Sequence, residues 1–252
     1  DGLVFCWGLG TNGRLGNAST SGNYTSPVAV STATGLADRT VTSVSAGNTH
    51  TCAVVDGTAY CWGSTTNGRL GNGATSGDVS QPVTVTATLL TAGSVTAINA
   101  GSTHTCAISD GTAYCWGYNN YGHLGDNTVT QRTTPVAVST AGVLGGRSVT
   151  SISAGASVSC VVGDSLGSCW GLGTSGQLGN SASSTSRVPV DAAVNGLTCP
   201  AGAVLVGSDC SLVQGSSFSY RLGYSIGSWT APASPWVTAT TSSAPSSSVR
   251  MV

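Results

Sequence analysis

Cysteines are the residues whose type and spacing could support chemistry in this 252-residue chain, which contains nine of them. The stretch THTCAVVDGTAYCWG at residues 49–63 places Cys52 and Cys61 nine positions apart. Two similar stretches contain the pairs Cys106 with Cys115 and Cys160 with Cys169. Such pairs could bind a metal, act as a redox couple or cross-link a hairpin. Structural zinc sites place cysteines about two to four residues apart and add a second pair or histidines, so we expect no metal here.

A tight hairpin accounts for the nine-residue spacing. Asp56-Gly57 lies midway between the first two cysteines, and an Asp-Gly pair is a strong signal for a two-residue turn. Counting outward from this turn sets Cys52 opposite Cys61 in a non-hydrogen-bonded pair, in which the Cα atoms lie about 4.5 Å apart. A disulfide tolerates that distance. The same count predicts two further hairpin disulfides, Cys106–Cys115 and, around Asp164-Ser165, Cys160–Cys169.

Cys6, Cys199 and Cys210 remain after these three pairs. A local Cys199–Cys210 bond is the simplest solution, and it leaves Cys6 as an unpaired or intermolecular thiol. The alternative is a Cys6–Cys210 bond, because Cys6 is a second hairpin cysteine without a first and Cys210 a first without a second. We favour the local bond and keep the alternative open.

The composition offers little for catalysis or for nucleic-acid binding. Only 7% of the residues are charged, and the sequence contains neither Lys nor Glu. Gly8 to Leu15 has the glycine spacing of a phosphate-binding loop but lacks its Lys-Ser/Thr ending. The net charge is −1 with scattered arginines, which argues against a nucleic-acid partner, and no apolar run has the length of a membrane helix. We therefore predict a protein that is not an enzyme and needs no cofactor.

Three independent markers repeat with a period of about 54 residues. Tryptophans that follow a cysteine occur at Trp7, Trp62, Trp116 and Trp170. A strand-like motif recurs as VTSVSAG, VTAINAG and VTSISAG, and a proline-led strand recurs at Pro27, Pro82, Pro135 and Pro189. About four short strands per repeat, with no strong helix signal, predict an all-β chain. Repeats of this kind arranged around an axis are typical of a β-propeller.

The motif G-x-x-H-T-C-A, followed by D-G-T-A-Y-C-W-G-x-x-x-x-G-x-L-G and a later P-V, resembles the repeat of the regulator of chromosome condensation family. The matching positions in the first two full units are Gly47, His50, Trp62, Gly63, Gly68, Leu70, Gly71 and Pro82, and Gly101, His104, Trp116, Gly117, Gly122, Leu124, Gly125 and Pro135. A later unit has Val158 in place of the histidine. The resemblance implies a propeller that presents loops for binding. Seven blades are usual in that family, and this chain departs from that count.

We expect incomplete blades at both chain ends. The predicted β-propeller spans residues 1–227 and a Pro/Ser/Thr-rich C-terminal arm spans 228–252. Its units are a half-unit 1–38, full units 39–92, 93–146 and 147–196, and a degenerate unit 197–227 with a hairpin turn at Gln214-Gly215. Because the chain opens on DGLVFCWG, already strand-like, we also expect that an upstream segment has been removed.

The predicted function is a non-catalytic structural or adhesion component. The disulfides predict an extracellular or cell-surface location, since such bonds persist in oxidising compartments. Protein or surface-glycan partners, or copies of the chain itself joined through incomplete blades, would then be its ligands. The alternative is a secreted, monomeric binding module, an inhibitor or a ligand-recognition propeller.

Two sets of residues are candidate sites for this function. Tyr118, Tyr121 and His123 differ from the equivalent positions of the other units and are candidate ligand contacts. Asn17 and Asn23 each begin an Asn-x-Ser/Thr triplet in a predicted loop and are candidate glycosylation sites.

Overall fold

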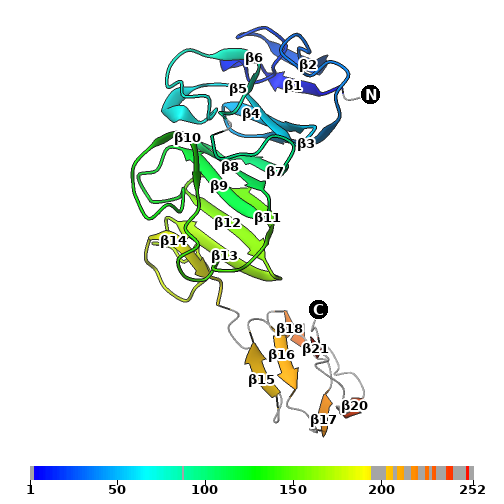
Figure 1. Ribbon diagram of the computed structural model, residues 1–252, viewed down its shortest axis with the longest axis vertical. Helices are drawn as coiled ribbons and strands as arrows, with labels where there is room; N and C mark the ends of the chain where they lie inside the picture. The colour runs from blue at the N-terminus through cyan, green and yellow to red at the C-terminus, as the bar shows by residue number, and fades with distance from the viewer. Residues whose placement is uncertain are drawn as a thin grey trace. The chain divides into compact units, whose positions relative to one another are not determined.

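The computed structural model describes residues 3–86 and 88–193, together with the backbone of seven strands in residues 194–252. Contacts divide the chain into two units, Asp1–Ala193 and Val194–Val252. The first unit holds the repeats and every side chain discussed below (Figure 1). Each unit is described by itself.

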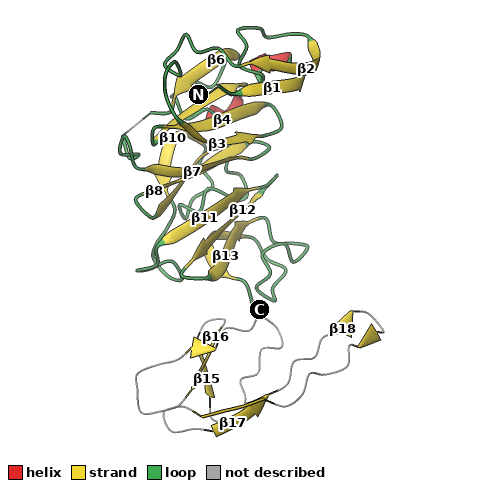
Figure 2. Cartoon of the chain, turned by 90° about the vertical axis from the view of Figure 1, so that its right-hand side faces the viewer, coloured by secondary structure: helices red, strands yellow, loops and turns green. Residues whose placement is uncertain are grey.

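The first unit is all-β, as predicted, and consists of antiparallel sheets that follow one another in chain order (Figure 2). A two-stranded sheet, here the half-blade, pairs β1 (Phe5–Leu9) with β2 (Asn23–Ala29). Three four-stranded sheets follow, and we call them blades 1, 2 and 3. Their strands are β3 (Val41–Ala46), β4 (His50–Val55), β5 (Thr58–Gly63) and β6 (Val79–Thr84); β7 (Val95–Ala100), β8 (His104–Ser109), β9 (Thr112–Gly117) and β10 (Arg132–Ala137); and β11 (Val149–Ala154), β12 (Val158–Gly163), β13 (Leu166–Gly171) and β14 (Ser186–Asp191). Two short 3-10 helices occur at Thr11–Gly13 and Thr66–Gly68.

The central hairpin of each blade has the register that the Asp-Gly count predicts. Cys52 lies opposite Cys61 across β4 and β5, and the equivalent residues of the other blades pair in the same way. Asp56 and Gly57 both have positive φ, 44° and 69°, as a type I′ turn requires at its two central residues. The structure contains the disulfides Cys52–Cys61, Cys106–Cys115 and Cys160–Cys169, with Cα atoms 4.0, 4.1 and 4.1 Å apart.

The proline-led strands are the edge strands of the sheets. Pro27 lies in β2, Pro82 in β6, Pro135 in β10 and Pro189 in β14, and each of these strands ends its sheet. Proline cannot donate a ladder hydrogen bond, and an edge strand leaves one side of its backbone without a partner in any case. The order of strands within each blade therefore follows from the proline positions.

The second unit departs from the predicted repeat. Its strands are β15 (Ala203–Val206), β16 (Asp209–Leu212), β17 (Ser217–Tyr220), β18 (Ser225–Ile226), β19 (Trp229–Thr230), β20 (Val237–Thr240) and β21 (Ser248–Val249). The hairpin predicted around Gln214-Gly215 is wrong: β16 pairs with β15 and β21, whereas β17 pairs with β20. Val206 of β15 pairs with Asp209 of β16.

The predicted end of the repeats at residue 227 lies outside the described residues and stays a prediction. The predicted degenerate unit 197–227 and the arm 228–252 both fall within Val194–Val252. Cys199 lies outside the described residues, and Cys210 is described only as part of strand β16. The pairing of these two cysteines therefore stays a prediction.

Candidate functional site

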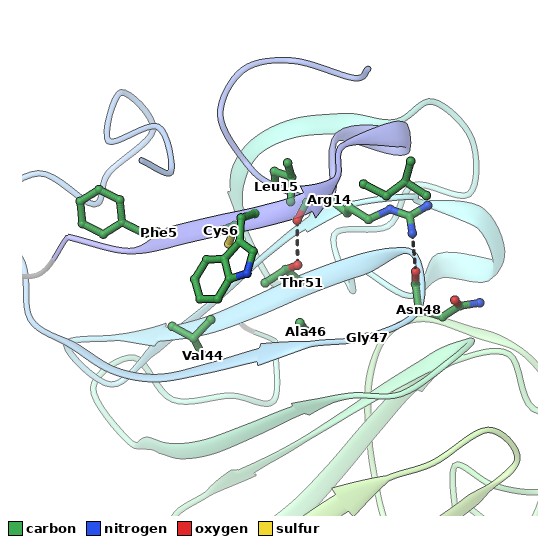
Figure 3. A pocket seen from close by; sticks show the side chains of 11 residues that line it. Phe5, Cys6, Arg14, Leu15, Val44, Ala46, Gly47, Asn48 and Thr51 are labelled. Atoms are coloured by element: carbon green, nitrogen blue, oxygen red, sulfur yellow. Dashed lines mark hydrogen bonds between the residues drawn. The ribbon is translucent and has the colours of Figure 1, made fainter. Parts of the chain in front are cut away.

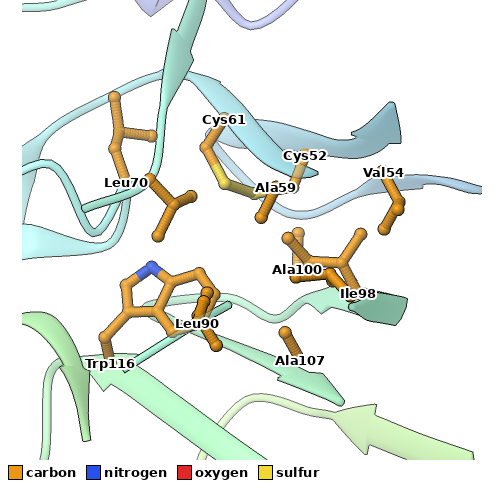
Figure 4. Close-up of a cluster of buried hydrophobic side chains, with 12 residues drawn as sticks. Cys52, Val54, Ala59, Cys61, Leu70, Leu90, Ile98, Ala100, Ala107 and Trp116 are labelled. Atoms are coloured by element: carbon orange, nitrogen blue, oxygen red, sulfur yellow. A yellow bond between two sulfur atoms is a disulfide. The ribbon is translucent and has the colours of Figure 1, made fainter. Parts of the chain in front are cut away.

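Neighbouring blades pack against each other through buried apolar side chains. Between blades 1 and 2, Trp116 of β9 lies in one cluster with Leu70 and with Cys61 of the first disulfide (Figure 4). An equivalent cluster between blades 2 and 3 contains Trp170 and Leu124. In each interface one blade contributes a tryptophan, and the other contributes the surface that receives it.

Each of these tryptophans donates its indole N–H to a backbone carbonyl of the preceding repeat. The Nε1–O distances are 3.0 Å from Trp62 to Arg14, 2.9 Å from Trp116 to Arg69 and 3.0 Å from Trp170 to His123. The same carbonyls accept hydroxyl hydrogen bonds, at 2.8, 2.7 and 2.7 Å, from Thr51, Thr105 and Ser159. Because the acceptor is a backbone oxygen, the residue that supplies it can be Arg or His without changing the contact.

A glycine two residues after each carbonyl leaves room for the indole. A Cβ atom added at Gly16, Gly71 or Gly125 would lie 2.7, 2.6 or 2.7 Å from the Nε1 atom of the tryptophan on the next blade. These glycines also have positive φ, between 70° and 73°, which side-chain-bearing residues rarely adopt. We call such a carbonyl and its glycine a tryptophan seat.

Two buried histidines form a second type of contact between blades. The Nε2 atom of His50 lies 2.8 Å from the hydroxyl of Thr105, and that of His104 lies 2.8 Å from the hydroxyl of Ser159. Each hydroxyl already donates its hydrogen to a seat carbonyl, so the histidine must be the donor and carries its proton on Nε2. The Nδ1 atoms are buried without a partner among the described residues.

Burial keeps these histidines neutral. It lowers the pKa of His50 to about 3, with a further contribution from the positive charge of Arg69, and it lowers the pKa of His104 well below its usual value. Val158 occupies the equivalent position of blade 3, as the sequence indicates. The histidines therefore contribute to packing between blades, and nothing in their geometry points to a catalytic role.

The half-blade exposes four large apolar side chains. Leu3, Phe5, Trp7 and Leu9 alternate along the chain at β1 and are 59%, 48%, 63% and 50% exposed. Trp62, Trp116 and Trp170, which occupy the place of Trp7 in the three blades, are 0% exposed. We call this surface the Trp7 face. Contiguous apolar surfaces of this kind commonly mark contacts with another protein.

A groove of about 390 Å³ adjoins the Trp7 face between β1 and blade 1 (Figure 3). Val44 of β3 lines it and is 46% exposed, whereas Ile98 and Ile152, at the same place in blades 2 and 3, are 4% and 8% exposed. At the end of the groove the Arg14 side chain donates to the carbonyl of Asn48 at 2.8 Å. The groove is therefore largely apolar, and its one cationic side chain, Arg14, is already hydrogen-bonded within the protein.

Cys6 also lines this groove and is the free cysteine among the described residues. Its side of β1 packs toward blade 1, so the thiol is half-buried. Burial raises the pKa of the Cys6 thiol, which disfavours the reactive thiolate. The site has no base beside the sulfur in its lining, so nucleophilic chemistry has no support there.

The candidate ligand contacts Tyr118, Tyr121 and His123 do lie together, but they differ in exposure. The two tyrosine rings approach His123 with centroids 6.0 and 6.5 Å from it, and His123 also contacts His104 at 4.6 Å. Tyr121 is 39% exposed, whereas His123 is 0% exposed and its pKa is lowered by burial to about 4. His123 is thus a seat residue that packs between blades, and Tyr118 and Tyr121 stay candidate contacts.

The remaining polar candidates show no arrangement for catalysis. Arg39–Asp56, Arg132–Asp126 and Arg147–Asp191 are ion pairs that tie turns and strands together. Within residues 3–86 and 88–193, no group of three or more His, Cys or Asp side chains could hold a metal ion. The described part of the chain also has no helix long and apolar enough to cross a membrane. Glycosylation of Asn17 and Asn23 stays a prediction.

Comparison with known proteins identifies the repeat. The family model described as "Regulator of chromosome condensation (RCC1) repeat" matches residues 1–54, 56–108 and 110–162. The human E3 ubiquitin-protein ligase HERC2 is 31% identical over 193 residues, which are 75% of this chain and 4% of HERC2. The human probable E3 ubiquitin-protein ligase HERC6 is 31% identical over 209 residues, 79% of this chain and 20% of HERC6. The chain thus spans a small part of these relatives.

Solved structures show the same fold. Human WBSCR16 matches with a TM-score of 0.67 at 22% identity, over 80% of this chain and 50% of that one. Yeast RCC1 (Prp20), in its complex with Kap60, matches with a TM-score of 0.63 at 21% identity, over 82% of this chain and 48% of that one. The chain therefore corresponds to about half of each solved propeller chain.

The predicted extracellular or cell-surface location is wrong, because the HERC ligases and yeast RCC1 that the chain matches are intracellular proteins. The prediction rested on the hairpin cysteines alone. In blades 1 and 2 these cysteines are 0% exposed and form part of the apolar clusters between blades. A buried cysteine pair packs as small apolar side chains whether it is reduced or oxidised, so its presence there does not identify a compartment.

Proposed function

Because the chain belongs to the regulator of chromosome condensation (RCC1) repeat family, we propose that it is a non-catalytic, protein-binding β-propeller module. The exposed Trp7 face carries this proposal. Tryptophan and phenylalanine contribute most to protein interfaces when a partner covers them, and here both stand beside Leu3 and Leu9 on one surface. The fold is used for such contacts elsewhere: one structure shows yeast RCC1 (Prp20) bound to Kap60, and another is described together with binding to Gsp1p and histones.

The ligase activity in the names of the HERC relatives is not part of the proposal. The chain corresponds to 4% of HERC2 and 20% of HERC6, and the free thiol of its described residues, Cys6, is half-buried with a pKa raised by burial. The similarity to the HERC proteins supports a role in recognition, in which the propeller binds a protein and other domains carry any catalytic activity.

A binding experiment with matched variants tests the proposal. The full chain is immobilised, proteins retained by it are quantified, and each is then tested in purified form by calorimetry. Trp7→Ala should abolish retention of at least one purified partner. Leu89→Ala, at a loop position that is 47% exposed, should retain it. The proposal fails if no purified protein binds in a manner that depends on the Trp7 face, or if a bound protein is chemically converted.

A second candidate is ligand recognition at Tyr118 and Tyr121. The observation in its favour is that Tyr121 is 39% exposed while its ring lies beside the buried ring of His123, which the half-buried Tyr118 also approaches. Tyr121→Ala should then weaken binding of a protein or glycan ligand at least about tenfold without changing the unfolding midpoint. Unchanged affinity would remove this candidate and leave the Trp7 face.

A further inference from the structure

The repeat contains a fourth tryptophan seat, at the end of the described part of the first unit. Gln177 and Gly179 occupy the positions of the seat residues in the last repeat. The equivalent pairs in the earlier repeats are Arg14 and Gly16, Arg69 and Gly71, and His123 and Gly125. Gly179 has the same left-handed backbone, with a φ of 65°. No indole lies against it: among the described residues the nearest atom to an added Cβ is the Cβ of Ala192, at 3.6 Å.

The surface around this seat is exposed where the other blades are covered. Val162 of β12 is 39% exposed, whereas Val54 and Ile108, at its place in blades 1 and 2, are 0% and 1% exposed. Gly167 and Gly179 are exposed, and the Cys160–Cys169 disulfide is only half-buried. Leu178, the seat leucine, remains fully buried, so the seat is already formed. We call this surface the Gly179 face.

The Gly179 face and the Trp7 face are the two halves of one type of interface. In the interface between blades 1 and 2, the first blade contributes Cys52, Val54, Cys61 and Leu70, and the second contributes Trp116. The Gly179 face repeats the first half with Cys160, Val162, Cys169 and Leu178, and the Trp7 face repeats the tryptophan. Neither half carries a charged side chain at these positions.

We propose that the partner of the Trp7 face is the Gly179 face of a second copy of this chain. Trp7 of one copy occupies the seat at Gly179 of the other, and its indole N–H donates to the carbonyl of Gln177. The contact has the pattern that Trp62, Trp116 and Trp170 show within one chain, with N–O distances of 2.9–3.0 Å. This inference rests on the proposed protein-binding function and names the partner of the same surface.

The contact is head to tail, so it joins unlike surfaces of two identical chains. Heterologous contacts of this kind close into a ring when the rotation between copies allows it. A dimer closed by two identical Trp7–Gly179 contacts is the expected assembly.

Sedimentation velocity of the full chain over a concentration series tests this proposal. The wild-type protein should sediment as a dimer. Trp7→Ala should raise the dimer dissociation constant at least about thirtyfold, the effect of losing one interface tryptophan. Val162→Asp, which places a charge on the Gly179 face, should do the same. The controls are Leu89→Ala and Val129→Asp, at loop positions that are 47% and 46% exposed, and both should remain dimeric.

Mixing the two face variants gives the decisive result. Trp7→Ala retains an intact Gly179 face and Val162→Asp retains an intact Trp7 face, so together they can form one complete contact although neither pairs with itself. A fluorescently labelled sample of one should therefore sediment faster when the other is added. Circular dichroism and unfolding midpoints matching those of the wild type exclude misfolding, and either variant suffices if the other fails to fold.

Several outcomes would overturn the proposal. A wild-type monomer at all concentrations would do so, whether Trp7 is accessible to a quencher or shielded by another part of its own chain. Dimers that persist in both variants, or variants that do not complement each other, would exclude the head-to-tail contact. The proposed function can still stand in these cases, because a monomer that loses a purified protein partner on Trp7→Ala would remain a binding module.

Discussion

Acidification from pH 7.5 to pH 5 should weaken the fold through its buried histidines. His50 and His123 have pKa values of about 3 and about 4, both lowered chiefly by burial, against about 6.5 in an unfolded chain. At pH 5 the unfolded chain binds protons that the folded chain excludes, so the free energy of unfolding falls as the pH falls below about 6.5. The linkage amounts to about 2 kcal/mol for each of these histidines at pH 5. His104, whose pKa is also lowered, acts in the same direction.

This loss of unfolding free energy at pH 5 is large relative to the stability of a typical domain, about 5–15 kcal/mol. Urea unfolding at pH 7.5, 6 and 5, followed by tryptophan fluorescence, measures it, because Trp62, Trp116 and Trp170 lie in the same interfaces. Asp56, Asp126 and Asp191 do not affect this measurement. Their pKa values are lowered from 3.8, so these carboxylates stay charged between pH 5 and pH 7.5.

Two variants separate protonation from general destabilisation. His50→Val, which copies the residue that blade 3 has at Val158, removes one hydrogen bond at pH 7.5 and should cost about 1–3 kcal/mol there. It should also reduce the stability difference between pH 7.5 and pH 5 by about 2 kcal/mol. Leu70→Ala should cost about 2–5 kcal/mol at pH 7.5 and leave that difference unchanged. A wild-type stability that is flat across this range, or equal pH differences in both variants, would refute the reasoning.

Three further predictions concern the contacts between blades and the free thiol. Trp116→Phe, which loses the N–H to the seat carbonyl, should lower the free energy of unfolding by about 1–3 kcal/mol, whereas Trp7→Phe should change it by less than about 0.5 kcal/mol in urea titrations of the monomer, at protein concentrations below the dimer dissociation constant. Gly125→Ala should cost more than about 2 kcal/mol because its Cβ would lie 2.7 Å from an indole nitrogen. In the monomer Gly179→Ala, with a similar φ and no indole of its own chain beside it among the described residues, should cost only the backbone strain of about 1–2 kcal/mol, and similar losses at the two glycines would contradict the seat. Cys6 should react with iodoacetamide more slowly in the native protein than in urea, because burial raises its pKa, and equal rates by mass spectrometry would contradict this.

The hairpins could be predicted from the sequence because their determinants are local. Asp56-Gly57 fixes the turn, the turn fixes the register, and the register sets Cys52 opposite Cys61 within a stretch of ten residues. The edge strands were predictable for the same reason, since proline excludes itself from the centre of a sheet. Local chemistry was sufficient wherever the repeat was intact.

The tryptophan seat could not be predicted, because its acceptor is a backbone carbonyl. Arg14, Arg69 and His123 have no side-chain property in common, so their shared role is invisible in the sequence. His123 attracted attention as a candidate ligand contact because it differs from the arginines, yet the structure buries it. The available signal was the glycine two residues later, which recurs in every repeat at Gly16, Gly71, Gly125 and Gly179.

The hairpin at Gln214-Gly215 and the location are the two predictions that failed. A single Gln-Gly pair was a weak turn signal. The location rested on a property of disulfides, whereas the relatives show that the same fold serves inside cells. Both errors came from extending a local rule beyond the segment that supported it.

The tryptophan seat consists of a backbone carbonyl and a glycine, so it depends little on side-chain identity. Because the seat requires only a carbonyl and a residue without Cβ, the side chain at the carbonyl position can vary from Arg14 to His123 to Gln177 without loss of the contact. The half-blade has two strands where a complete blade has four, and Trp7 is exposed there, whereas Trp62, Trp116 and Trp170 are buried in the complete blades. Association between copies then needs no surface evolved for that purpose, and Gly179 is the position at which a single added side chain should prevent it.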